Sequence, residues 1–226
     1  MKLNEVKKFL VFDTETTGVN VKKDRILTAS LVRSENKAIT SNTIWINPGV
    51  SIPSGATNIH GITDEKIKEV GADPVEALYS VKAAIYDAWE DGFVLVAHNM
   101  AYDASILDAE LRRHQLGSFD IKGPLVDTMV LFRMAGNQKA SLDAATKKYG
   151  IINKTAHSSE SDCMATLELL FKIIEHNPMV AEKNLRELYT AQRVSHRNWA
   201  VKTRKYFENI GKSFDSTGNW PKEEEE

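Results

Sequence analysis

Acidic side chains and one histidine recur in this sequence at spacings that could build a single metal site. They form three short motifs, D-x-E (Asp13, Glu15), H-N-x-x-Y-D (ending at Asp103) and H-x-x-x-x-D (His157, Asp162). Grouped carboxylates repel one another unless a cation neutralises them. A pair of divalent ions would do so, and such pairs are used to cleave phosphodiesters. The pattern therefore predicts a metal-dependent nuclease.

The two acids of the D-x-E pair can bind one metal together only if they lie on a strand. Residues 9–14 are apolar and rich in β-formers, and the turn signal Thr17-Gly18 follows them. In a strand, residues i and i+2 point to the same face, so Asp13 and Glu15 can bind one metal together. A second D-x-E, at residues 108–110, falls in a predicted helix, where the two acids point about 200° apart. We interpret that second copy as surface charge.

The H-x-x-x-x-D spacing also occurs twice, at His98–Asp103 and at His157–Asp162. In both copies the histidine lies in a loop or at a strand end, and the aspartate lies near a helix start. Each aspartate taken alone is equally explained as a helix cap, and His157 alone as an exposed loop histidine. Several acids at the ends of elements are harder to explain as independent caps. We interpret His98 as a structural residue.

The remaining elements predict a mixed α/β sheet flanked by helices. Residues 25–32 and 38–46 read as strands of an antiparallel meander, separated by the polar stretch 34–37. Asp73-Pro74 signals the start of a helix. Further along, strands are predicted at 93–97 and 125–127, and helices at 103–113, 128–134, 141–150 and 161–175. Three strands followed by alternating helices and strands indicate one layered α/β domain.

Composition is that of an ordinary globular protein. Of 226 residues, 42% are hydrophobic and 27% charged, and the net charge is −2. No apolar run approaches the roughly 18 residues of a membrane span. The short apolar run near the start leads straight into Asp13, so we expect neither a signal peptide nor a membrane partner. The single cysteine, Cys163, suits a cytoplasmic location and argues against disulfides and cysteine-based zinc sites.

The segment after Pro178 differs from the rest. We expect residues 1–177 to form the main domain, and residues 178–226 to form a helical, basic and aromatic extension with a solvated acidic tail from Glu223. Between Pro178 and Lys212 there are eight Lys or Arg against three Glu. Aromatic residues at 199, 206 and 207 are interleaved with these cations. Docking of the aromatics on the core is favoured over a nucleic-acid grip, and a subunit contact is a third option.

Six segments resemble, in order, the motifs of DEDDh 3′–5′ exonucleases (DnaQ-like), above all those of the proofreading epsilon subunit of bacterial DNA polymerase III. They are FDTETTG, ATNIHGITDE, AHNMAYDASIL, VDTMVLFR, SLDAATKKYG and HSSESDCMATLELL. The resemblance covers about residues 8–175 and implies the ribonuclease-H-like fold, a mixed sheet flanked by helices. It includes a loop between the third strand and the first helix. The segment after Pro178 does not match the polymerase subunit's tail, which leaves assembly with a polymerase, or self-association, open.

Site residues follow from this resemblance by position. It implies that two Mg²⁺ or Mn²⁺ ions are held by four acids and that His157 is the general base. A neutral imidazole is needed for that role, and a histidine's ordinary pKa of about 6.5 makes it accessible. The four metal-binding acids are Asp13, which would bridge the ions, Glu15, Asp103 and Asp162. Substrate contacts are implied for Thr16, Thr17, His60 and Asn99. Asp127 recurs in the family without being a metal ligand.

Three functions are compatible with these residues. The first is removal of nucleoside 5′-monophosphates from the 3′ end of DNA, preferably single-stranded, in proofreading or repair. The second is RNA trimming or oligoribonucleotide degradation by the same chemistry, since nothing in the motifs reads a 2′-hydroxyl. The third is an inactive nucleic-acid-binding module. The presence of all five active-site residues favours an enzyme.

Overall fold

A five-stranded mixed sheet forms the centre of the protein in this computed structural model, which describes residues 1–153, 157–214 and 216–223. The strand order is β3-β2-β1-β4-β5. Strands β1, β2 and β3 pair antiparallel, whereas β4 and β5 run parallel to β1. Their bounds are β1 Lys8–Thr16, β2 Ile26–Glu35, β3 Ala38–Trp45, β4 Val94–Ala97 and β5 Leu125–Asp127. The predicted mixed sheet is confirmed.

The hairpin between β2 and β3 is tighter than predicted. Its ladder continues to the pair Glu35–Ala38, so only Asn36 and Lys37 form the turn. Both have positive φ, 50° and 74°, as a two-residue hairpin turn requires. The sequence prediction ended the second strand too early because polar residues at 33–35 resemble a loop, while the ladder hydrogen bonds decide where pairing stops.

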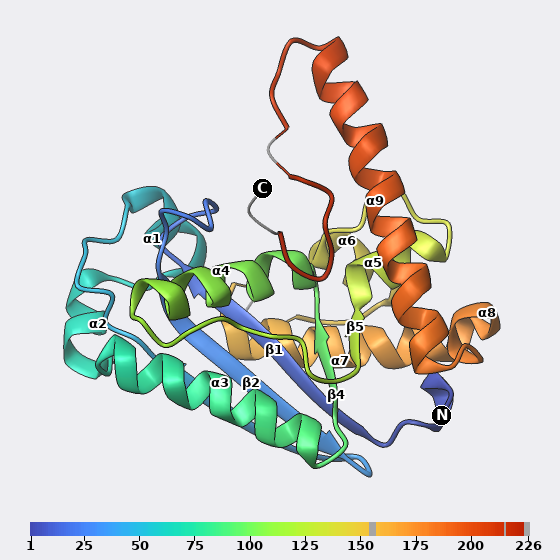
Figure 1. Cartoon of the computed structure of the whole chain (residues 1–226), viewed down its shortest axis with the longest axis horizontal. Helices are drawn as coiled ribbons and strands as arrows, with labels where there is room; N and C mark the ends of the chain where they lie inside the picture. Colours follow the sequence, from blue (N-terminus) through green and yellow to red (C-terminus); the bar gives the residue numbers. More distant parts are fainter. Residues whose placement is uncertain (154–156, 215, 224–226) are drawn as a thin grey trace.

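Helices cover both faces of the sheet (Figure 1). Leu10 and Phe12 of β1 share a buried cluster with residues of α3 and α4, whereas Phe9 and Val11 share another with residues of α5, α6 and α7. Strand alternation thus gives β1 one face toward each helical layer. The helices are α3 Pro74–Glu90, α4 Met100–Arg113, α5 Thr128–Met134, α6 Leu142–Tyr149 and α7 Ser159–His176, with a short 3₁₀ turn η1 at Leu3–Glu5.

Two short helices occupy the stretch that the resemblance describes as a loop. They are α1, Ser54–His60, and α2, Asp64–Val70. Gly61 ends α1 at a φ of 73°, and the Thr63 side chain caps α2 by accepting from the Lys66 amide. The turn between these two short helices places His60 at a bend in the chain.

The C-terminal extension contains α8, Pro178–Ala181, and the long helix α9, Leu185–Asn209. The first half of α9 packs on α5 and β5, while its second half rises beyond the body and the chain returns beside it (Figure 1). The buried residues of α9 are Leu188, Gln192, His196 and Ala200. None of the helices in the described ranges has the length and apolarity to cross a membrane.

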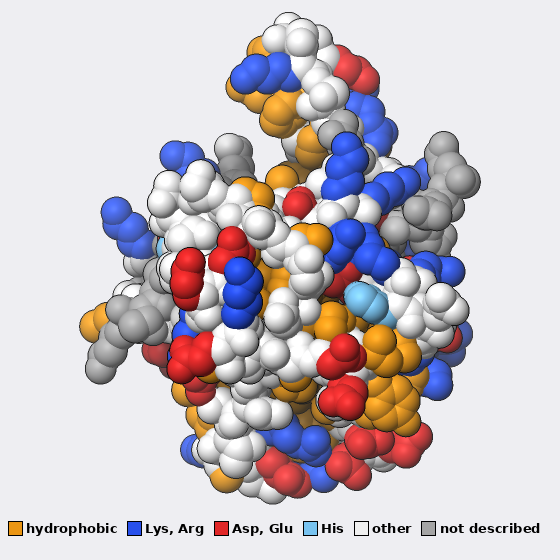
Figure 2. Space-filling view, turned by 90° about the vertical axis from the view of Figure 1, so that its left-hand side faces the viewer, with side chains coloured by type: hydrophobic (Ala, Val, Ile, Leu, Met, Phe, Trp, Pro, Cys, Tyr) orange, Lys and Arg blue, Asp and Glu red, His pale blue; other side chains and the backbone are white. Residues whose placement is uncertain are grey.

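Docking of the extension is therefore observed, but not through all the aromatics expected. The Trp199 ring lies 3.9 Å from the Arg133 guanidinium of α5, whereas Phe207 stacks on Phe214 within the extension and Tyr206 is 61% exposed. Figure 2 shows Lys and Arg side chains grouped below the projecting end of α9, with Asp and Glu gathered lower on that face. The division into domains at residue 177 stays a prediction.

The start of the acidic tail is not solvated as predicted. The Glu223 amide donates to the Ser105 hydroxyl at 2.7 Å, and its carboxylate accepts from the Thr217 amide at 2.8 Å. The tail residues 224–226 lie outside the described residues. Hydrogen bonds to α4 and to the returning chain thus hold Glu223, which a run of like charges in the sequence does not reveal.

Candidate active site

The end of β1 carries the D-x-E pair. Asp13 and Glu15 continue the odd-numbered series of Phe9 and Val11, so they face the layer of α7. Thr14 faces the opposite layer, toward α4. Both acids are half-buried, and the ladder with β2 becomes irregular directly after Glu15. The strand therefore presents two carboxylates where regular pairing ends.

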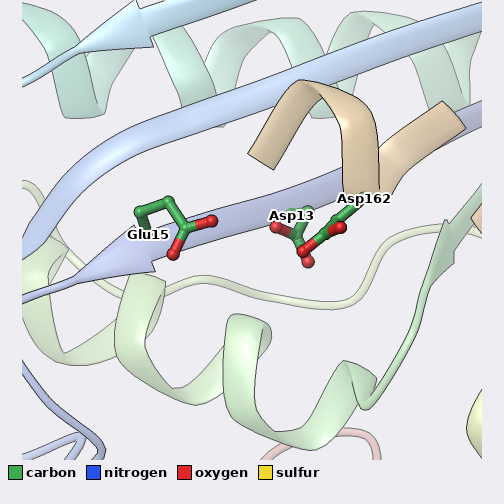
Figure 3. A group of neighbouring side chains, drawn as sticks. All are labelled: Asp13, Glu15 and Asp162. Carbon is green, nitrogen blue, oxygen red and sulfur yellow. The ribbon is translucent and has the colours of Figure 1, made fainter. Parts of the chain in front are cut away.

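Helix α7 adds the third carboxylate. Asp162 lies in its first turn, as predicted, and the Ser158 side chain caps the helix. The buried Ser159 hydroxyl lies 2.9 Å from that of Thr28 and 2.8 Å from that of Ser30, which fixes this helix end against β2. Figure 3 shows the carboxylates of Asp13 and Asp162 facing each other, with Glu15 on the same strand as Asp13. One oxygen from each of these three acids lies within 4.8 Å of the others.

Asp103 reaches the same place from the other layer. It lies in the first turn of α4, is 3% exposed, and accepts a hydrogen bond from the Thr14 hydroxyl at 2.8 Å. Its charge acts on Asp13 and on Glu15, raising the pKa of both. The four acids of the sequence prediction thus come together from β1, α4 and α7.

Desolvation and mutual repulsion shift the carboxyl groups. Burial first, then the charges of Asp103, Asp162 and Glu15, hold the pKa of Asp13 well above its usual range. Burial and the same kind of repulsion raise the pKa of Glu15 to about 8. Burial raises the pKa of Asp103 to about 7, although the Thr14 hydrogen bond opposes the shift. The pKa of Asp162 is also raised by burial. Holding four acids so close together raises all four pKa values and costs folding free energy, which indicates a site that binds cations.

The donor set fits a hard divalent cation. All four side chains offer carboxylate oxygens, which suit Mg²⁺ or Mn²⁺ rather than softer metals. Three of those oxygens are already close enough together to share an ion. The fourth acid, Asp103, is not one of these three and accepts a hydrogen bond from Thr14. The residues therefore fit divalent metal binding, and the number of ions belongs to the proposal below.

Without metal, the protein should become less stable as pH rises. Glu15 has a pKa of about 8 in the folded protein and an ordinary value of 4.5. Between these values the folded protein holds a proton that the unfolded chain has lost, so the free energy of unfolding falls with increasing pH. Melting temperatures measured in chelator across this window should decline, and saturating Mg²⁺ should flatten the decline because it binds the ionised carboxylates.

The matched variant for this measurement is Glu15→Gln. It removes one titrating group while keeping the side-chain size, so its melting temperature in chelator should depend less steeply on pH than that of the wild type. Identical slopes for the two proteins would show that Glu15 does not titrate in this window.

His157 lies beside the clustered acids, next to Asp162. It is exposed and has a positive φ of 69°. Its backbone donates to the Asp162 carboxylate, which opposes the rise in the pKa of Asp162. His60 is the second histidine there: burial lowers its pKa, its ring faces the backbone of Thr16, and His157 is close enough to act on it. The bend between α1 and α2 thus borders the site.

His98, in the other H-x-x-x-x-D copy, is a structural residue, as interpreted from the sequence. Its ring nitrogens lie 2.9 Å from the Thr128 hydroxyl and 2.9 Å from the Ala140 carbonyl oxygen. Burial lowers its pKa to about 4. The ring is therefore neutral and fully engaged between β4, α5 and the start of α6.

Two of the residues expected to contact substrate, Thr16 and Thr17, directly follow Glu15 in the chain. The Thr16 hydroxyl donates to the Gly18 carbonyl at 2.7 Å, and the Thr17 hydroxyl donates to the Asp24 carboxylate at 3.1 Å, so both hydroxyls are occupied within the loop. Asn99 precedes α4 with a φ of 80°, and its side chain makes no capping bond. Thr16, Thr17, His60 and Asn99 stay predictions as substrate contacts.

Comparison with known proteins identifies the family. A model of the RNase_T family, described as exonuclease, matches residues 10–170. That span includes all four carboxylates and His157. The chain belongs to the RNase_T exonuclease family. Within it, the motifs quoted above place the chain among the DnaQ-like exonucleases.

Relatives of this exonuclease domain include far longer proteins. The DNA polymerase III PolC-type of Lacticaseibacillus paracasei is 28% identical over 217 residues, and that of Streptococcus thermophilus is 30% identical over 220. Both matches cover 90% of this chain, yet the chain spans only 14% of either relative. The matched segment is thus one part of those polymerases.

Solved exonucleases share the ribonuclease-H-like fold. E. coli exonuclease I, solved with a dT13 oligonucleotide, has a TM-score of 0.67 at 17% identity, covering 77% of this chain and 42% of that one. Exonuclease X, solved with 5′ overhanging duplex DNA, has a TM-score of 0.61 at 21% identity, covering 81% of this chain and 99% of that one. The mixed sheet and its helical layers are therefore the architecture of exonucleases.

Three residues that contact the candidate site were not singled out from the sequence. Thr14 binds Asp103, and Asn153 donates to the Asp162 carboxylate at 2.6 Å. The Tyr102 hydroxyl lies 2.7 Å from both the Thr16 hydroxyl and the Gly18 carbonyl, which fixes the loop after β1. Strand alternation could have indicated that Thr14 faces α4, and Tyr102 lies in a motif already noted. Asn153 carries no sequence signal.

The interpretation of the second D-x-E as surface charge is wrong for Glu110. Glu110 is 1% exposed and pairs with Arg113 and with Arg25, and it accepts from the Ile26 amide at 3.3 Å. Asp108 accepts from the Phe119 amide at 2.7 Å. The two side chains contact different partners, so they do not share a site, as the helical geometry predicted. Tertiary contacts buried Glu110 against the start of β2.

Proposed function

We propose that this chain is a metal-dependent 3′–5′ exonuclease that releases nucleoside 5′-monophosphates from DNA, with a preference for single strands. The observation that carries the proposal is the convergence of four carboxylates, from three elements, at one end of the sheet in a chain of an exonuclease family. Two divalent ions, Mg²⁺ or Mn²⁺, would be held by Asp13, Glu15, Asp103 and Asp162.

The bound ions would neutralise the carboxylates and stabilise negative charge on the scissile phosphodiester. His157 supplies the proton transfer: its exposed imidazole would take a proton from a water molecule as the water oxygen attacks the phosphorus. The bond between phosphorus and the 3′ oxygen then breaks. The 3′ oxygen of the shortened strand takes up a proton from solvent, the His157 imidazolium returns its proton to solvent, and the terminal nucleotide leaves as a 5′-monophosphate.

The bend between α1 and α2 would recognise the 3′ end of the nucleic-acid strand. Ile59, 62% exposed, precedes His60, which borders the site. An exposed apolar side chain next to His60 suits apolar contact with a terminal base, whichever base it is. A paired end would have to open before entering, so single strands should be preferred. Matches to PolC-type polymerases favour a role in proofreading or repair in the cytoplasm.

The test is digestion of 5′-labelled DNA and RNA strands of one sequence, with Mg²⁺ and with chelator. We expect a ladder shortened from the 3′ end, one nucleotide at a time, only with metal, and faster on single-stranded than on duplex DNA. Faster digestion of RNA would change the substrate class but not the chemistry.

A circular single strand and a 3′-blocked strand are the controls, and both should persist. Fragments released from the circle would show an endonuclease instead. No cleavage of any substrate, with nucleic-acid binding retained, would identify an inactive binding module.

A further inference from the structure

Asp127 is not one of the four clustered acids, yet its side chain accepts several hydrogen bonds. It ends β5 and is 1% exposed. Its Oδ1 accepts from the amides of Met129 and Val130, at 2.9 and 3.2 Å, and so caps α5. The same carboxylate caps α4, because Oδ1 accepts from the Asn99 amide at 3.1 Å and Oδ2 accepts from the Met100 amide at 3.0 Å. One side chain therefore holds the starts of two helices.

The α4 cap matters for the site because this helix has no cap of its own. Asn99, the residue before it, has a left-handed φ of 80° and its side chain makes no capping hydrogen bond. The first amides of a helix need an acceptor from elsewhere. Asp127 provides that acceptor, and Asp103 lies within the same first turn. The position of Asp103 thus depends on where Asp127 is held.

The C-terminal extension holds Asp127 from two directions. The buried Trp220 indole donates to Asp127 Oδ2 at 3.1 Å, and its ring packs on Tyr189 of α9 with centroids 5.3 Å apart. Gln192 of α9 accepts from the Asp127 amide at 2.7 Å and donates to the Leu125 carbonyl at 3.3 Å. The Gln192 amide thereby occupies the open edge of β5, the last strand of the sheet, as a neighbouring strand would.

We infer that Trp220 and Gln192 are positioning residues, through which the C-terminal extension orients Asp103 for the proposed cleavage. Both lie beyond residues 10–170 matched by the family model. Without the Trp220 indole, Oδ2 keeps only the Met100 amide, and the cap of α4 loses the side-chain hydrogen bond that ties it to the extension. The first turn of α4 then loosens, and Asp103 moves relative to Asp13. The inference uses the proposed function only in taking Asp103 as a site residue.

The test compares Trp220→Phe with a matched variant, Trp89→Phe. Trp89 belongs to the same buried cluster, and its indole also donates to an internal acceptor, which is the Pro124 carbonyl at 3.0 Å rather than the cap of α4. Hydrogen–deuterium exchange of the amides at 99–103 should become about tenfold faster in Trp220→Phe, because a hydrogen bond that holds the cap is lost. Exchange there should be unchanged in Trp89→Phe.

Steady-state kinetics on single-stranded DNA then connect the cap to the site. Trp220→Phe should lower kcat about 10-fold or more with KM nearly unchanged, as expected when support of a metal ligand is lost. Trp89→Phe should keep kcat despite a comparable loss in melting temperature. Equal exchange at 99–103 in both variants, or an unchanged kcat in Trp220→Phe, would overturn the inference. An inactive wild type would defeat the proposed function alone, because the exchange comparison needs no catalysis.

Discussion

Asp13→Asn is expected to lower the rate of DNA cleavage at least about 10³-fold while leaving the protein folded. The charges of the other three acids all act on Asp13, so its carboxylate lies at the centre of the group. An amide has nearly the same size but cannot replace the charge that binds divalent ions. The measurement is a single-turnover rate on a 5′-labelled strand with saturating Mg²⁺.

Stability separates this loss from misfolding. Because the fold holds the Asp13 carboxyl at a raised pKa, removing its charge should raise the melting temperature of the metal-free protein near pH 8. Mg²⁺ should then stabilise the variant less than the wild type. Asp87→Asn, an exposed acid on α3, is the control and should change neither rate nor Mg²⁺ response. Near-normal cleavage by Asp13→Asn would remove it from the metal site.

His157→Asn should cut the rate by roughly 10²–10⁴, the usual contribution of a positioned general base. Asparagine is chosen because it tolerates the φ of 69° at this position better than alanine does. His157 is exposed and is not among the clustered carboxylates, so the melting temperature and the stabilisation by Mg²⁺ should stay as in the wild type. The rate at several pH values, measured under single turnover, tests the assignment.

His98→Ala is the comparison, since His98 occupies the same place in the other H-x-x-x-x-D copy. It should lower the melting temperature, because the Thr128 hydroxyl and the Ala140 carbonyl lose their partner in the core. Its rate per folded molecule should fall far less than that of His157→Asn. The opposite order of effects would make His98 the functional histidine.

Local features of the chain were readable without the structure because they depend on neighbours in sequence. Strand β5 and helix α5 have the predicted bounds, and Asp73 caps α3 as its Asp-Pro signal indicates. The pairing of Asp13 with Glu15 on one face of β1 follows from strand alternation alone. Helices α1 and α2 were not predicted, because the resemblance describes this stretch as a loop and each helix is only 7 residues long.

The sequence by itself determined which residues are candidates for the chemistry and on which kind of element each lies, since side-chain type and backbone period are local properties. Only the tertiary structure decided how these elements meet. Asp103 and Asp162 approach the end of β1 from opposite helical layers, Glu110 pairs with Arg25 from the segment before β2, and the Trp220 indole donates to Asp127. Such contacts depend on packing between distant segments, and no spacing along the chain encodes them directly.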